Sequence, residues 1–141
     1  MPIVGFGFDK ITVERKGQST DQEKIQNNIK INSLEESKIA IGKEEKEAIA
    51  VFFNYVVNYG SMGQLEMDGH ILYYDTQENI KELINEWNKD KKVNKVFSAN
   101  MYNYVLRKVT IKALELEEDV GLPLHMTPPR IELRTKEDKK D

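Results

Sequence analysis

The chain lacks cysteine and has only two histidines, and these shortages exclude several kinds of site. Without thiols there can be neither a disulfide nor a thiolate-bound metal. A zinc site that used both His70 and His125 would still need carboxylate ligands to complete it. We therefore expect neither a metal nor a cofactor.

The sequence also lacks a strong charge of one sign and a long apolar run. It carries 21 Lys and Arg against 24 Asp and Glu, and the basic residues are mixed with acidic ones, unlike the basic stripe of a nucleic-acid-binding protein. No window approaches the length of a membrane span, and the N-terminal segment lacks the positive region of a signal peptide. We expect a cytoplasmic protein without a nucleic-acid or membrane partner, with one domain at 1–133 and a charged tail at 134–141.

Catalytic motifs are missing as well. No glycine-rich segment has the spacing of a phosphate-binding loop, and no serine lies in a nucleophile motif. His70 is interpreted as a surface or partner-facing residue, and His125 as an outward residue of its segment. Glu66 and Asp68 share a strand face and are interpreted as solubility charges, because a hard cation needs six or more oxygens. No catalytic residue is predicted, so the chain is not expected to be an enzyme.

The most informative feature that is present is a pair of alternating runs, 48–59 and 64–74, joined by Gly60-Ser-Met-Gly63. Side chains alternate across a strand, so each run places an apolar row on one face of a sheet. The glycines favour a tight turn, and together the runs predict a long β-hairpin. The apolar row comprises Ile49, Val51, Phe53, Tyr55, Val57 and Tyr59 in the first run and Leu65, Met67, Ile71 and Tyr73 in the second.

The even positions of this hairpin are partly apolar too, most clearly at Phe52, Val56, Leu72 and Tyr74. A sheet that is apolar on both faces has its second face covered by a helix, a partner subunit or a bound client. Leaving four such side chains in water forgoes roughly 1.5–3 kcal/mol apiece, so we expect a dimer or a dimer of dimers. A helix around Trp87 could instead cover this face within one subunit.

The segments before the hairpin predict further strands. In 6–13 the apolar residues change parity at Asp9-Lys10, which predicts a β-bulge. Short strands are predicted at 29–31 and 38–41. The polar run 17–24 is expected to be a loop.

Helices are predicted after the hairpin. Asp75-Thr-Gln-Glu78 fits a capping box, followed by a helix that buries Ile80, Leu83, Ile84 and Trp87. A second, long helix is expected from about 94 to about 117, ending before Gly121. Strands followed by helices predict an α+β domain, an antiparallel sheet of about four strands with the long helix on one face. The apolar stripe of the long helix comprises Phe97, Met101, Val105, Val109, Ala113 and Leu116.

Residues 122–133 are rich in proline and are expected to form an extended strap that packs on the domain. With this strap, the order of parts resembles the SecB-like superfamily of protein-export chaperones. The second long helix that follows the strap in the bacterial chaperone is not found here, and a helix containing Trp87 replaces a loop-like crossover. The resemblance rests on Phe6-Gly-Phe-Asp-Lys-Ile-Thr-Val13, Ile29-Lys-Ile-Asn32, Leu65-Glu-Met-Asp-Gly-His-Ile71 and Gly121-Leu-Pro-Leu-His-Met-Thr-Pro-Pro128.

The resemblance implies a chaperone that holds unfolded or partly folded polypeptides in apolar grooves. The alternative is a dedicated interaction or assembly module, toxin–antitoxin-associated or ribosome-associated, whose apolar sheet face binds one specific partner. The two hypotheses differ in promiscuity. The side chains predicted to bind polypeptide or to form the oligomer face are Phe52, Val56, Leu72 and Tyr74 from the sheet and Leu122, Leu124 and Met126 from the strap.

Overall fold

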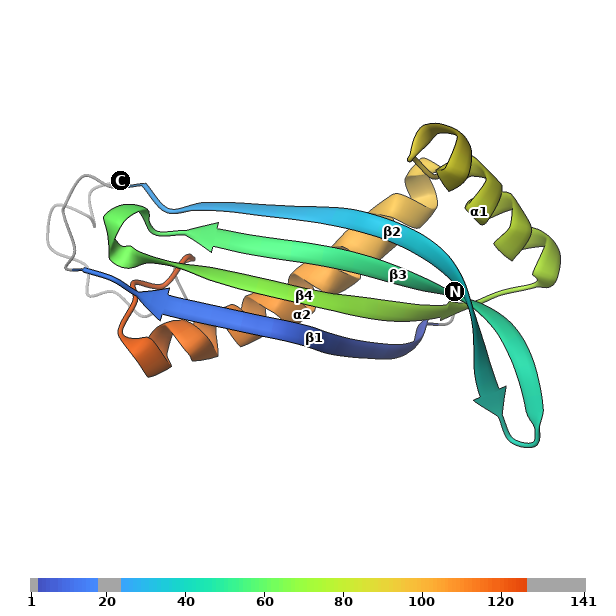
Figure 1. Ribbon diagram of the computed structural model, residues 1–141, viewed down its shortest axis with the longest axis horizontal. Helices are drawn as coiled ribbons and strands as arrows, with labels where there is room; N and C mark the ends of the chain where they lie inside the picture. Colours follow the sequence, from blue (N-terminus) through green and yellow to red (C-terminus); the bar gives the residue numbers. More distant parts are fainter. Residues whose placement is uncertain (1–2, 18–23, 127–141) are drawn as a thin grey trace, which may run out of the picture.

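The computed structural model describes residues 3–17 and 24–126, which form a four-stranded antiparallel sheet and two α-helices (Figure 1). The strand order is β1-β4-β3-β2, so the central pair is the predicted hairpin. This arrangement confirms the α+β class and the four-stranded sheet. The elements are β1 (Ile3–Arg15), β2 (Gln26–Ile41), β3 (Glu44–Asn58), β4 (Gly63–Tyr74), α1 (Gln77–Asp90) and α2 (Lys95–Val120).

The turn between β3 and β4 depends on glycine. Gly60 has φ 69° and opens one turn of 3₁₀ helix that ends at Met62. Gly63 has φ 151°, and a Cβ atom there would lie 2.0 Å from the carbonyl oxygen of Glu14 on β1. No other residue type fits this position, because the backbone of β1, which pairs with β4 here, occupies the space that a Cβ atom would need.

Strand irregularities are predicted well on β1 and poorly on β2. The register between β1 and β4 shifts between Phe8 and Lys10, which confirms the predicted bulge at Asp9. The two short strands predicted at 29–31 and 38–41 are wrong, because β2 is one strand of 16 residues. The register shifts between Ile31 and Ser33, so residues of opposite parity point to the same face before and after the shift. An alternating pattern in the sequence therefore does not reveal the full length of β2.

Both helices pack on the sheet face that carries the odd residues of β3 and β4, here called the helix face. α2 crosses behind the sheet in Figure 1 and buries one residue every fourth position. The final buried position is Glu117, not the predicted Leu116. α1 buries Ile80, Leu83 and Trp87 in the same core cluster. The residues of α2 that are buried are Phe97, Met101, Val105, Val109, Ala113 and Glu117.

The helix ends follow simple capping chemistry, with one correction. Thr76, and not Asp75, caps α1: its hydroxyl accepts from the amide of Asn79. α2 starts at the predicted place with Asn94 as its cap, and it ends at Gly121 with φ 74°, as expected. None of the helices in the described part is both long and apolar enough to cross a membrane.

The opposite side of the sheet, here called the open face, carries the even residues of β3 and β4. The hypothesis that the Trp87 helix covers this face is wrong, since Trp87 and Leu83 join the core on the helix face. In the described chain, neither helix lies over the open face (Figure 1). The β2–β3 hairpin also extends beyond the other two strands and turns sharply at its tip (Figure 1).

Candidate polypeptide-binding surface

The open face divides into an apolar half near the tip of the β2–β3 hairpin and a polar half at the other end. Strand register sets the division, because cross-strand partners share a face. Leu72 pairs with Ala50 and Gly5, and Tyr74 pairs with Ala48. The apolar half, a name kept below, comprises Ala48, Ala50, Phe52, Leu72 and Tyr74.

Glycines on β1 keep the apolar half shallow. A Cβ atom on Gly5 would lie 3.1 Å from Cδ1 of Leu72, and one on Gly7 would lie 3.1 Å from Cε1 of His70. The side chains of Leu72 and His70 therefore lie over β1, in space that the side chain of any residue other than glycine at positions 5 and 7 would occupy. Phe52 continues the surface towards β2, with its ring centroid 6.0 Å from that of His70. The result is a surface on which Phe52, Leu72 and Tyr74 are half-buried, above Ala48 and Ala50, which are buried.

The polar half is organised by one amide. Nδ2 of Asn54 donates to Oε2 of Glu66 at 2.9 Å and to Oδ1 of Asp68 at 2.7 Å. The amide bridges two carboxylates that would otherwise repel each other. Glu66 and Asp68 thus have a structural partner in addition to solvent. Val56, predicted as part of the apolar surface, pairs with Glu66 and lies within this half.

His70 marks the boundary between the halves. Its Nδ1 lies 2.9 Å from Oδ1 of Asp9, the residue that the β1 bulge inserts, and its side chain is 30% exposed. This placement agrees with its interpretation as a surface residue.

The described part of the strap, residues 122–126, lies on the other side of the sheet. Its backbone amide at His125 reaches Glu117 on α2, and the His125 ring stands 6.4 Å from that of Tyr55 on the helix face. Leu122 is buried in the core, whereas Met126 is 48% exposed and Leu124 is half-buried. The seven predicted binding residues therefore do not line one groove. Residues 127–133 of the predicted strap and the tail 134–141 lie outside the described residues.

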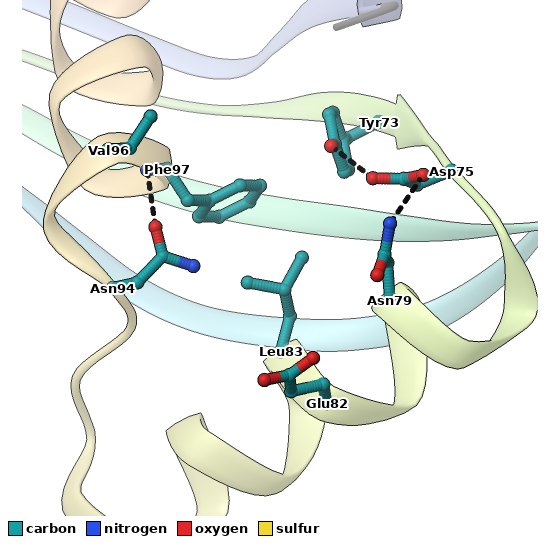
Figure 2. A pocket seen from close by; sticks show the side chains of 8 residues that line it. All are labelled: Tyr73, Asp75, Asn79, Glu82, Leu83, Asn94, Val96 and Phe97. Carbon is teal, nitrogen blue, oxygen red and sulfur yellow. Dashed lines mark hydrogen bonds between the residues drawn. The ribbon is translucent and has the colours of Figure 1, made fainter.

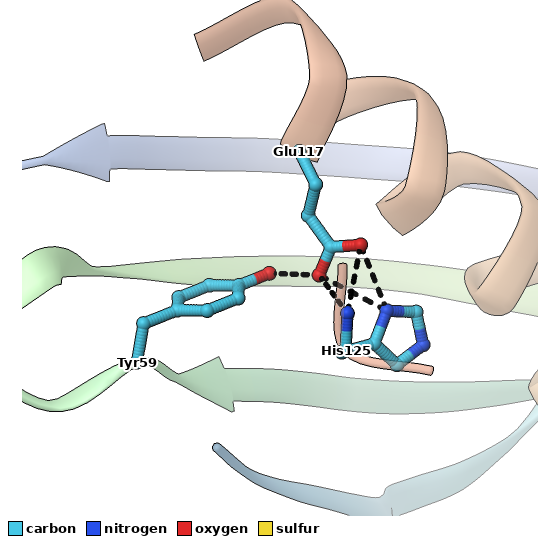
Figure 3. A network of polar contacts seen from close by, with 3 residues as sticks. All are labelled: Tyr59, Glu117 and His125. Carbon is cyan, nitrogen blue, oxygen red and sulfur yellow. Dashed lines mark hydrogen bonds and ion pairs between the residues drawn. The ribbon is translucent and has the colours of Figure 1, made fainter. Parts of the chain in front are cut away.

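A buried polar cluster fastens the strap (Figure 3). The carboxylate of Glu117 accepts from the hydroxyl of Tyr59, from the backbone amide of His125 at 3.2 Å and from its Nδ1 at 3.0 Å. The side chain of Glu117 is fully buried and that of His125 is 4% exposed. The prediction that His125 points outward is wrong, because this carboxylate holds the ring inside.

The same cluster affects two tyrosines of β3. Burial, and then the hydrogen bond to Glu117, raise the pKa of Tyr59. Burial, and then the negative charge of Glu117, raise the pKa of Tyr55 to about 12. Both phenols are thus held in their neutral form. The cluster joins three parts of the chain: the end of α2, the end of β3 and the segment at His125.

A separate pocket of about 240 Å³ lies between β4 and the two helices (Figure 2). Burial opposes ionisation of Asp75 there, but hydrogen bonds from Tyr73, Asn79 and Thr76 hold its pKa below the usual range. Burial, and then the bond to Asp75, raise the pKa of Tyr73. These three donors already satisfy the carboxylate, so the pocket offers little unmet hydrogen bonding to a ligand. Within the described ranges, no group of three or more His, Asp or Glu residues is placed to hold a metal ion.

Comparison with known proteins gives one likeness in solved structures that we report. The chain is similar to the SecB-like chaperone Rv1957 of Mycobacterium tuberculosis, solved in complex with a ChAD peptide from the Rv1956 HigA1 antitoxin. The likeness covers 95% of this chain and 92% of that one, with 8% sequence identity and a TM-score of 0.47. No protein-family model and no curated protein matches the sequence.

Proposed function

We propose that the protein is a SecB-like chaperone that holds unfolded or partly folded polypeptides on the apolar half of its open face. The observation that carries this proposal is the absence of any described helix over a surface that presents Phe52, Leu72 and Tyr74 together. A shallow apolar surface without deep pockets binds extended chains with little sequence preference. No acid, base and oxyanion donor converge on a described cavity, which favours binding over catalysis.

The test is the suppression of aggregation of several unrelated unfolded clients. We expect the double variant Phe52→Ser/Leu72→Ser to lose most of the suppression, because it removes one aromatic and one aliphatic side chain from the surface. The matched control is Asn28→Ser/Gln64→Ser, two exposed polar residues on the same face. Circular dichroism of each variant checks that the fold is retained.

Two results would contradict the proposal in different ways. Full suppression by Phe52→Ser/Leu72→Ser would place client binding elsewhere on the molecule. No suppression by the unmodified protein with any client would reject the chaperone and favour a module with one dedicated partner.

The same surface has an alternative occupant, a second copy of the chain: in such a dimer two apolar halves shield each other, and a client binds only where the dimer dissociates. Because Phe52, Leu72 and Tyr74 are already half-buried, covering them across a two-fold axis would recover only part of the roughly 1.5–3 kcal/mol gained by burying a fully exposed side chain. Light scattering should then give twice the monomer mass, and Leu72→Glu should give monomers. A monomer at micromolar concentration for the unmodified protein would reject this dimer and leave the surface free for clients.

A further inference from the structure

A second cavity, of about 300 Å³, lies where the α1–α2 connection meets β2. Its apolar wall comes from three parts of the chain: Ile31 of β2, Trp87 of α1, and Val93 with Tyr102. Ile31 is on the helix face, so this cavity is separate from the apolar half of the open face. Its volume suits one or two bulky side chains, not a large cofactor.

Positive charge surrounds this cavity. Lys91, Lys92 and Lys95 all line it and are exposed, and the described lining includes no acidic side chain. The carboxylate of Glu86 accepts from the backbone amide of Asn94, between the lining residues Val93 and Lys95. The lining thus carries three positive charges although the net charge of the chain is −3. Its charge complements an acidic ligand.

The cavity borders a free strand edge. β2 is the last strand of the sheet, and among the described residues nothing pairs with its outer side. An unpaired edge presents alternating N–H and C=O groups to an extended polypeptide. A segment lying along β2 near Ile31 could therefore place a side chain into the cavity.

We propose that this cavity and the adjoining edge of β2 bind an extended polypeptide segment in which an acidic residue neighbours a bulky apolar one. The apolar side chain enters between Trp87, Val93 and Tyr102, while the carboxylate faces Lys92 and Lys95. The inference rests on the proposed polypeptide-binding function and narrows it. It names a second binding site on the molecule and the kind of sequence that this site would select.

A polypeptide fits these observations better than a nucleic acid. Single-stranded nucleic acids stack bases on open aromatic rings. Trp87 is only 9% exposed, and the ammonium of Lys91 stands 5.8 Å from the centroid of its ring. The free backbone edge of β2 also matches an amide backbone and has no counterpart in a phosphate chain.

Trp87 is the only tryptophan of the chain and lines the cavity, so its fluorescence reports occupancy directly. The probe is a short peptide in which glutamate alternates with leucine and which contains no tryptophan. We expect a saturable change in emission with this peptide. A peptide with lysine in place of each glutamate should bind at least roughly tenfold more weakly, since each attractive charge pair becomes repulsive.

The test variant is Lys92→Glu/Lys95→Glu, which retains Lys91 because that residue ends α1 in a left-handed conformation. It should bind the glutamate peptide roughly tenfold more weakly, since two favourable charge pairs become repulsive. The matched control is Lys38→Glu/Lys43→Glu, the same charge change on exposed lysines near the hairpin tip, and it should leave affinity within about twofold.

Three results would overturn the inference: equal affinity for both peptides, unchanged affinity in Lys92→Glu/Lys95→Glu, or tighter binding of a single-stranded oligonucleotide than of the glutamate peptide. In each case the aggregation assay on Phe52→Ser/Leu72→Ser still reports on the open face. The proposed function and this narrower inference can therefore fail separately.

Discussion

The two faces of the sheet come from the same strands and differ in what covers them. On the helix face, Phe53, Met67 and their neighbours meet α1, α2 and the strap, and they are almost fully buried. On the open face, the adjacent residues Phe52 and Leu72 meet only their neighbours within the sheet. Apolar content alone does not separate a core from a binding surface. The difference lies in whether another element of the chain packs on it.

The polar clusters of the two faces differ in the same way. On the helix face, the carboxylate of Glu117 has no access to water, so its hydrogen bonds come from Tyr59 and His125. On the open face, Asn54 bridges Glu66 and Asp68, whose carboxylates remain partly exposed. Loss of a hydrogen bond in the first cluster leaves a buried polar group without a partner, whereas water can replace a lost hydrogen bond in the second.

The sharpest test of the comparison uses two neighbouring phenylalanines. We expect Phe53→Ala to lower the free energy of unfolding by about 3–5 kcal/mol, because Phe53 is 1% exposed and stacks on Phe6. Phe52→Ala should lower it by no more than about 1 kcal/mol, because the half-buried ring packs on one side only. Urea denaturation measures both. Equal losses would mean that the open face is packed as tightly as the core.

Much of the fold follows from local sequence. The alternation of β3 and β4, the parity change at Asp9 and the stop at Gly121 each reflect a rule that acts over a few residues. The alternation of side chains does not predict the full length of β2, because a bulge within the strand changes which residues face the core. The cap of α1 was placed one residue early because Asp75 and Thr76 are both good capping residues.

The buried cluster could not be assembled from local rules. One signal was available, because the four-residue step of the α2 stripe leads from Ala113 to Glu117. A buried position for a glutamate requires donors. Those donors are 58 and 8 residues away in sequence, at Tyr59 and His125, and only the fold brings them together. The cavity beside Trp87 was missed for the same reason, since Ile31 reaches it from β2.

The second test compares the two polar clusters. Glu117→Gln replaces a carboxylate that accepts from three groups with an amide that has one acceptor oxygen and brings donors of its own. We expect a loss of about 1–3 kcal/mol in the free energy of unfolding, measured in urea. Asn54→Ala should cost less than about 1 kcal/mol, because water reaches both of its partners. If Asn54→Ala lowered the free energy of unfolding more than Glu117→Gln, the cluster of the open face would contribute more to stability than the buried cluster, contrary to our expectation.

The smallest expected effect is a pH dependence confined to the helix face. The pKa of Tyr55 is raised to about 12 in the folded protein, by burial and then by the charge of Glu117. A phenol in the unfolded chain titrates near pH ~10, so the unfolded state loses its proton first. Stability from Tyr55 is therefore complete below about pH 10 and declines as the pH rises towards about 12, by on the order of 2 kcal/mol. Tyr55→Phe should make this decline smaller in urea denaturation between those pH values without abolishing it, because the raised pKa values of Tyr59 and Tyr73 contribute to it as well. An unchanged decline would show that Tyr55 does not couple folding to pH.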